Sequence, residues 1–196
     1  MMDTFHDISV VVISLEDTPF LERCIRSCIT QTLPGFSSEI IVVTDKTQTY
    51  CCSVLNNYKQ HVNEIIETSK LTLSKAIDLG LRKACGRFVM LINVNDFLSD
   101  YALLFQSVFL YDNQDFEGVR VDYWLVDKEN DRKLERINAT NKPVSYGVLF
   151  RKESLVKKIL YHQSLENLTE ETFQKMFGHE AKIGHLPISF YRRQTS

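Results

Sequence analysis

The sequence lacks any long hydrophobic run. Its apolar segments are far shorter than the roughly 20 residues with which a helix crosses a membrane, so we expect no membrane span. The opening segment, Met1 to Asp7, also lacks the basic and apolar regions of a secretion signal. With neither feature present, we expect a cytoplasmic protein.

An excess of charge of either sign is also missing. The chain has 23 basic and 25 acidic residues among 196, which gives a net charge of −2. Proteins whose main partner is a nucleic acid usually carry a basic surplus that pairs with phosphates. The composition therefore predicts no nucleic-acid partner.

The cysteines form neither a disulfide framework nor a set of metal ligands. There are five of them, an odd number without the spacing of a disulfide scaffold. Cys24 and Cys28 share one helix face, but no second pair lies at a spacing that would complete a four-ligand metal site. We interpret them as reduced thiols that behave as small apolar side chains.

No internal repeat, low-complexity stretch or linker divides the chain, and 196 residues fit one domain. Over residues 1–110, short apolar runs alternate with segments of helical periodicity. The predicted strands cover 8–14, 39–43, 65–66 and 87–92, and the predicted helices cover 17–33, 50–58, 74–84 and the region around 103–108. This alternation is typical of a parallel sheet covered by helices on both faces.

Beyond residue 110 the alternation weakens. Strands are predicted at 119–126 and 148–150, helical segments at 153–159 and 169–177, and a final short strand at 188–191. We expect one domain over 1–196, with a change of character between residues 1–110 and residues 111–196 rather than two separate domains.

Three polar clusters follow predicted strands, at residues 14–17, 44–47 and 93–96. In an open parallel sheet, ligands bind beyond the carboxyl ends of the strands. Any one such cluster could simply end a strand or cap a helix. Because all three fall at the same predicted rim, together they favour a binding site.

Several segments resemble the family 2 glycosyltransferases. The run from Leu21 to Ser27, then Gln31–Pro34 and Glu39–Asp45, is similar to the opening of that family. The resemblance continues through Ala76, Gly80, Ala84 and Gly86 to the strand that carries the family's D-x-D-D motif, and then in 147–152, 169–171 and 190–193. It implies a GT-A-like fold, which is a three-layer α/β/α arrangement with a mainly parallel central sheet, and a nucleotide-sugar donor. On this basis residues 1–110 would form the nucleotide-binding half and residues 111–196 the acceptor-side half.

The resemblance also implies a nucleotide-sugar site. Asp45 matches the second Asp of the family's "V-D-D", which recognises the uracil of a UDP-sugar by accepting a hydrogen bond from a base N–H. A cap at the strand end is the structural alternative for Asp45. The other expected binding residues are Ser14, Glu16, Asn93, Asn95 and Asp96.

Two neighbouring glutamates are the candidates for catalysis. Glu171 matches the carboxylate that deprotonates the acceptor hydroxyl in inverting members of the family, and Glu170 is the alternative base. A structural role stays open for both, because acidic residues in the first turn of a helix capped by Thr169 are stabilised by the helix dipole.

The metal motif is degenerate. Where the family has D-x-D-D, this chain has Asn93-Val94-Asn95-Asp96, and neutral amides replace two anionic ligands. Mg²⁺ and Mn²⁺ favour carboxylates, so any such ion would bind weakly here, with Asp96 as its best remaining ligand. Fixed cations could then offset the diphosphate charge. The candidates are Lys46, Lys70, Lys75, Arg192 and Arg193.

Three functions are consistent with these residues. The first is an inverting transferase, metal-independent or nearly so, that moves a sugar from a UDP-sugar to a carbohydrate or glycan acceptor. The second is a catalytically degenerate GT-A-fold module that binds nucleotides or regulates a partner without transferring sugar. The third is another doubly wound nucleotide-binding protein, because a fold alone does not determine function.

Overall fold

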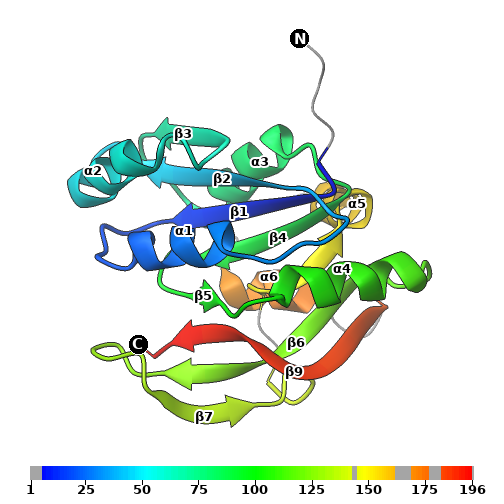
Figure 1. Ribbon diagram of the computed structural model, residues 1–196. Coiled ribbons are helices and arrows are strands. Elements are labelled where there is room, and N and C mark those ends of the chain that lie inside the picture. Colours follow the sequence, from blue (N-terminus) through cyan, green and yellow to red (C-terminus); the bar gives the residue numbers. More distant parts are fainter. Residues whose placement is uncertain (1–5, 143–144, 162–168, 177–181, 196) are drawn as a thin grey trace.

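The computed structural model describes residues 6–142, 145–161, 169–176 and 182–195 (Figure 1). Its strands form one sheet in the order β3-β2-β1-β4-β8-β6-β9-β5, with β7 paired to β6. The strands are β1 (Ile8–Ser14), β2 (Ser38–Asp45), β3 (Glu64–Thr68), β4 (Phe88–Asn93), β5 (Phe97–Leu98), β6 (Gly118–Val126), β7 (Lys133–Ile137), β8 (Leu149–Arg151) and β9 (Ile183–Gln194). The helices are α1 (Leu21–Ile29), α2 (Thr49–Tyr58), α3 (Leu73–Lys83), α4 (Ala102–Asp112), α5 (Lys152–Tyr161) and α6 (Glu170–Met176).

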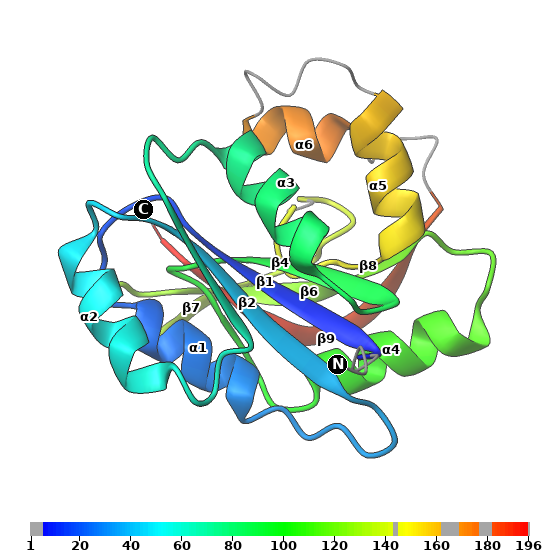
Figure 2. The same ribbon diagram turned by 90° about the horizontal axis from the view of Figure 1, so that it is seen from above.

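The first half is a parallel sheet between two helical layers. β1 lies between β2 and β4, and β3 follows β2, with every pair parallel. All seven residues of β1 are buried, because helices cover both faces of the sheet. Figure 2 shows α1, α2 and α4 on one face and α3, α5 and α6 on the other. The predicted three-layer arrangement is confirmed.

The second half extends the same sheet with mixed pairing. β8 runs antiparallel to both β4 and β6. β6 and β9 are parallel, with register shifts on both sides of Asp122. Near its end, β9 also pairs antiparallel with the two-residue strand β5.

The sequence analysis missed two strands and shortened a third. β5 has only two residues, too few to show any periodicity. Four of the five residues of β7 are exposed, so its sequence lacks the alternation of a half-buried strand. β9 has 12 residues, whereas the prediction covered only 188–191. Pro187, within it, is typical of a break in a strand and hid the longer element.

A buried polar staple joins the amino ends of the parallel strands. The Ser9 hydroxyl donates to Glu39 Oε1 over 2.5 Å, and the amide of Cys85 donates to the same oxygen over 2.6 Å. The amide of Gly86 in turn donates to Ser9 Oγ over 2.8 Å. A Cβ atom at Gly86 would lie 2.6 Å from the Ser9 backbone nitrogen, so this staple requires glycine there.

No helix in the part of the chain that the structure describes is both long enough and apolar enough to cross a membrane.

We predict that Gly86→Ala destabilises the fold. The added methyl group meets the backbone of Ile8 and Ser9, which cannot move as a side-chain tip could. Overpacking of this kind costs about 1–3 kcal/mol, and a domain of this size loses about 2–4 °C of Tm for each kcal/mol. Thermal unfolding measures the loss. Asn57→Ala, at an exposed position on α2, is the control. Equal Tm values for the two variants would contradict the prediction.

Candidate functional site

A cavity of about 340 Å³ lies at the rim where β1 and β4 end. It is walled by the turns that follow β1 and β4, by the turn between β6 and β7, and by the end of β9. Its lining residues are Glu16, Asn93, Asn95, Asp96, Lys128, Tyr146, Arg193, Gln194 and Thr195. Four of the six residues that the sequence analysis proposed for nucleotide-sugar binding therefore meet at one cavity.

Asp96 is the most buried of these four, with 5% of its surface exposed. The Tyr191 hydroxyl donates to its Oδ2 over 2.5 Å, and the Gln194 amide donates to its Oδ1 over 2.9 Å. Burial raises the pKa of Tyr191 far above its ordinary value, and the neighbouring Asp96 charge adds to this. The Asp96 carboxylate thus joins the turn after β4 to the end of β9.

The two asparagines shape the turn after β4. The backbone N–H of Asn95 donates to Asn93 Oδ1 over 2.9 Å, and the Thr18 hydroxyl donates to Asn95 Oδ1 over 2.8 Å. The side-chain amide of Asn95 donates to the Glu16 carboxylate. These contacts fix the wall of the cavity. In each asparagine the side-chain oxygen, Oδ1, accepts a hydrogen bond from the protein.

The residues at the cavity do not fit a divalent metal ion. Mg²⁺ and Mn²⁺ require several hard oxygen donors that point at the ion. Both Asp96 oxygens and the amide oxygens of Asn93 and Asn95 already accept hydrogen bonds from the protein. Within residues 6–142, 145–161, 169–176 and 182–195, no group of three His, Cys, Asp or Glu side chains could hold an ion.

Asp45 and Ser14 lie at the same rim but do not line this cavity. Asp45 accepts hydrogen bonds from the amides of Thr47 and Leu71, both over 3.0 Å, and from the Thr47 hydroxyl over 2.8 Å. These bonds lower the pKa of Asp45 to about 2. Ser14 is fully buried, and its hydroxyl donates to Gln48 over 2.8 Å. Asp45 therefore joins the loop before α2 to the loop before α3, and Ser14 packs beneath the rim.

Glu171 lies on α6, on the face of the sheet that also carries α3 and α5 (Figure 2). Its side chain is exposed and lies 2.7 Å from Lys175 Nζ, an i,i+4 ion pair that lowers the pKa of Glu171. It is not among the residues that line the cavity. The side chain of Glu170 falls outside the described part of the structure. The role of either glutamate as a base stays a prediction.

Arg23 is a site residue that the sequence analysis missed. Its guanidinium forms an ion pair with Asp131 in the β6–β7 turn and donates to the Asn95 carbonyl over 2.5 Å. It also lies 4.4 Å from the ring centre of Phe97 and 4.7 Å from that of Phe20. Burial lowers the pKa of Arg23, although the Asp131 charge opposes the shift. Arg23 and Asp131 are 108 residues apart, so no local pattern could pair them.

A second polar cluster surrounds Asp122. His185 of β9 is half-buried, with Nε2 2.7 Å from Asp122 Oδ1. Burial alone would raise the pKa of Asp122, but three hydrogen bonds, including one from Arg136, bring it below its ordinary value. His179 and Glu180, which the sequence places near His185, lie outside the described residues.

The family model described as glycosyl transferase family 2 matches residues 9–194. The poly(ribitol-phosphate) beta-glucosyltransferase of Bacillus spizizenii is 25% identical over 111 residues, which cover 55% of this chain and 18% of that protein.

Crystal structures of S. aureus TarS 1–349 share the fold. One has a TM-score of 0.74 at 17% identity and covers 96% of this chain and 60% of the other. A second, in complex with UDP-GlcNAc, has a TM-score of 0.75 at 16% identity and covers 97% of this chain and 59% of the other. The expected GT-A-like fold is confirmed. The chain spans under two thirds of each of these relatives.

We predict that the effect of Asp45→Asn on stability depends on pH. The folded pKa of Asp45, about 2, lies below the unfolded value of about 3.9. The carboxylate therefore stabilises the fold above pH 4 and loses this effect as the pH falls toward 2. Urea unfolding of both proteins between pH 7 and pH 2.5 should show the difference shrinking. Asp115→Asn, at an exposed carboxylate, is the control. A difference that is constant with pH would contradict the prediction.

Proposed function

Because this chain belongs to glycosyltransferase family 2, we propose that it transfers a sugar from a UDP-sugar donor to an acceptor hydroxyl. The cavity at the carboxyl rim carries this proposal. It is built from residues that stand at the family's motif positions, namely Glu16 after β1 and Asn93, Asn95 and Asp96 after β4. Residues 1–110 would form the nucleotide-binding half, and residues 111–196 would form the acceptor-side half, which also contributes the β6–β7 turn and the end of β9 to the cavity. In the same proposal, residues 1–196 form a single domain, and the protein acts in the cytoplasm.

The donor lies across the strand ends in this proposal. Asp45, on the neighbouring strand β2, would accept a hydrogen bond from the uracil N–H, because its carboxylate is ionised. The ribose and the phosphates would lie in the cavity beside Asn93 and Asn95. The complexes of S. aureus TarS with UDP-GlcNAc and with UDP support a uridine nucleotide as the first donor to test.

The transfer would invert the anomeric carbon. The B. spizizenii relative is a beta-glucosyltransferase, and a β-linkage made from an α-linked UDP-sugar requires inversion. The acceptor oxygen attacks the anomeric carbon, the bond from this carbon to the phosphate oxygen breaks, and UDP leaves with the electron pair. Glu171, the residue at the position of the family's base, takes the acceptor proton. The name of that relative makes poly(ribitol phosphate) the first acceptor to test among glycans and similar polymers.

The first test of this proposal is donor binding. Thermal unfolding of the purified protein with UDP, UDP-glucose and UDP-GlcNAc, each with and without Mn²⁺, should show a higher Tm with at least one uridine nucleotide. A ligand at 100 times its Kd stabilises the native state by about 2.7 kcal/mol. Unchanged Tm values with every nucleotide would contradict the proposed donor site. Binding without turnover on any glycan acceptor would favour a regulatory nucleotide-binding module instead.

The second test concerns Glu171 as the proposed general base. Glu171→Gln should lower kcat by about 10²- to 10⁴-fold, the usual contribution of general base catalysis, and leave donor affinity unchanged. Glu153→Gln is a matched control, because Glu153 forms the same exposed i,i+4 pair with Lys157 on α5. If the two variants have equal kcat, Glu171 is not the base.

A further inference from the structure

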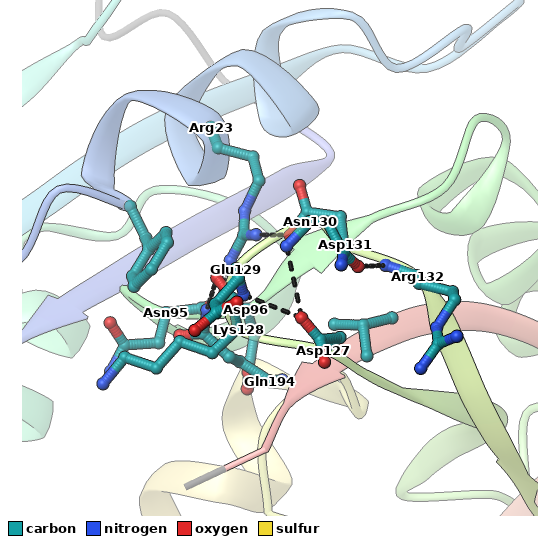
Figure 3. Close-up of polar contacts among 12 residues, drawn as sticks. Arg23, Asn95, Asp96, Asp127, Lys128, Glu129, Asn130, Asp131, Arg132 and Gln194 are labelled. Atoms are coloured by element: carbon teal, nitrogen blue, oxygen red, sulfur yellow. Dashed lines mark hydrogen bonds and ion pairs between the residues drawn. The ribbon is translucent and has the colours of Figure 1, made fainter.

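The turn between β6 and β7, residues 127–132, forms one wall of the cavity and is held by its own hydrogen bonds. Asp127 Oδ1 accepts from the amide of Glu129 over 2.9 Å and from that of Asn130 over 3.3 Å. Asn130 Oδ1 accepts from the Arg132 amide over 3.0 Å, and the Asp127 amide donates to the Arg132 carbonyl over 2.9 Å. The turn therefore has a defined shape (Figure 3).

Contacts from other elements hold this turn against the cavity. The Arg23 guanidinium forms an ion pair with Asp131 and at the same time donates to the Asn95 carbonyl (Figure 3). From β9, the Gln194 side chain donates to the Lys128 carbonyl over 3.4 Å. The same guanidinium thus binds both the turn that carries Lys128 and the turn that carries the asparagines.

Lys128 and Arg193 are the two cationic residues that line the cavity. The Lys128 ammonium forms no ion pair within the described portion of the chain. A nucleoside diphosphate carries negative charge that grows on the leaving phosphate as the sugar departs, and fixed cations stabilise such charge strongly. The amides of Asn93 and Asn95 cannot supply this charge.

We propose that Lys128, together with Arg193, binds the diphosphate of the donor where family members with an intact D-x-D-D motif use a metal ion. This inference rests on the proposed function. Arg23 and Asp131 act as positioning residues, because they hold the turn that carries Lys128. Arg193 is among the cations that the sequence predicts for such a role, whereas Lys128 is not.

Calorimetric binding of UDP and of uridine tests the role of Lys128. Lys128→Gln should raise the Kd for UDP by about 10-fold or more, the usual effect of losing one charge-assisted hydrogen bond. Its Kd for uridine should not change, because uridine has no phosphate. Lys128→Arg should recover most of the UDP affinity. Lys133→Gln is the matched control, since Lys133 lies in the same hairpin but not at the cavity.

The outcomes separate the two proposals. If the wild-type protein does not bind UDP or any UDP-sugar, the proposed function fails. If it binds UDP and Lys128→Gln binds it equally well, only the present inference is overturned. UDP binding by the wild type that requires Mn²⁺ and is lost in EDTA would also overturn it, because the metal would then supply the charge.

A double-mutant cycle tests the positioning pair. Asp131→Asn breaks the ion pair with Arg23 and should weaken UDP binding by less than Lys128→Gln does. In the double variant the two losses should be less than additive, because both act through the position of one ammonium group. Fully additive losses, or an Asp131→Asn protein with wild-type UDP affinity, would contradict the positioning role.

Discussion

The buried carboxylate of Asp96 is the interaction on which the rest of the site depends. Asp96 lies in the turn after β4 and accepts hydrogen bonds from Tyr191 and Gln194 of β9. An unpaired buried carboxylate would be costly, so β9 must bend until its end reaches the turn after β4. That bend places Arg193 and Thr195 at the cavity. The contact between the turn after β4 and the end of β9, and the far wall of the cavity, therefore have one physical cause.

Arg23 joins the turn after β4 to the turn between β6 and β7. Its guanidinium lies against two aromatic rings and binds both Asn95 and Asp131. A planar group with several donors can hold two turns at once, as a lysine ammonium in the same place could not. The site is therefore built from two short turns fixed to each other and to the sheet. Such preorganised groups stabilise developing charge without the cost of reorganisation during the reaction.

The amide side chains at residues 93 and 95 give the turn after β4 its shape without adding negative charge to the rim. Asn93 and Asn95 still form a tight turn through an amide-to-side-chain hydrogen bond. Neutral amides are weaker ligands than carboxylates for a divalent cation. The diphosphate of the proposed donor would therefore need positive charge from side chains of the protein. The cavity offers one in Lys128 and Arg193, which reach it from β6–β7 and β9.

By itself, the sequence determined the parallel half of the fold and the polar rim at the ends of its strands. The β-branched runs of β1, β2 and β4 and the helical spacing between them are local patterns, set by burial on both faces. The positions of Glu16, Asn93, Asn95 and Asp96 follow from those strand ends. Only the tertiary structure decided that Asp45 and Ser14 bond within the rim, that Arg23 meets Asp131, and that Lys128 faces the cavity. These contacts join segments up to 108 residues apart, and no local periodicity encodes such pairs.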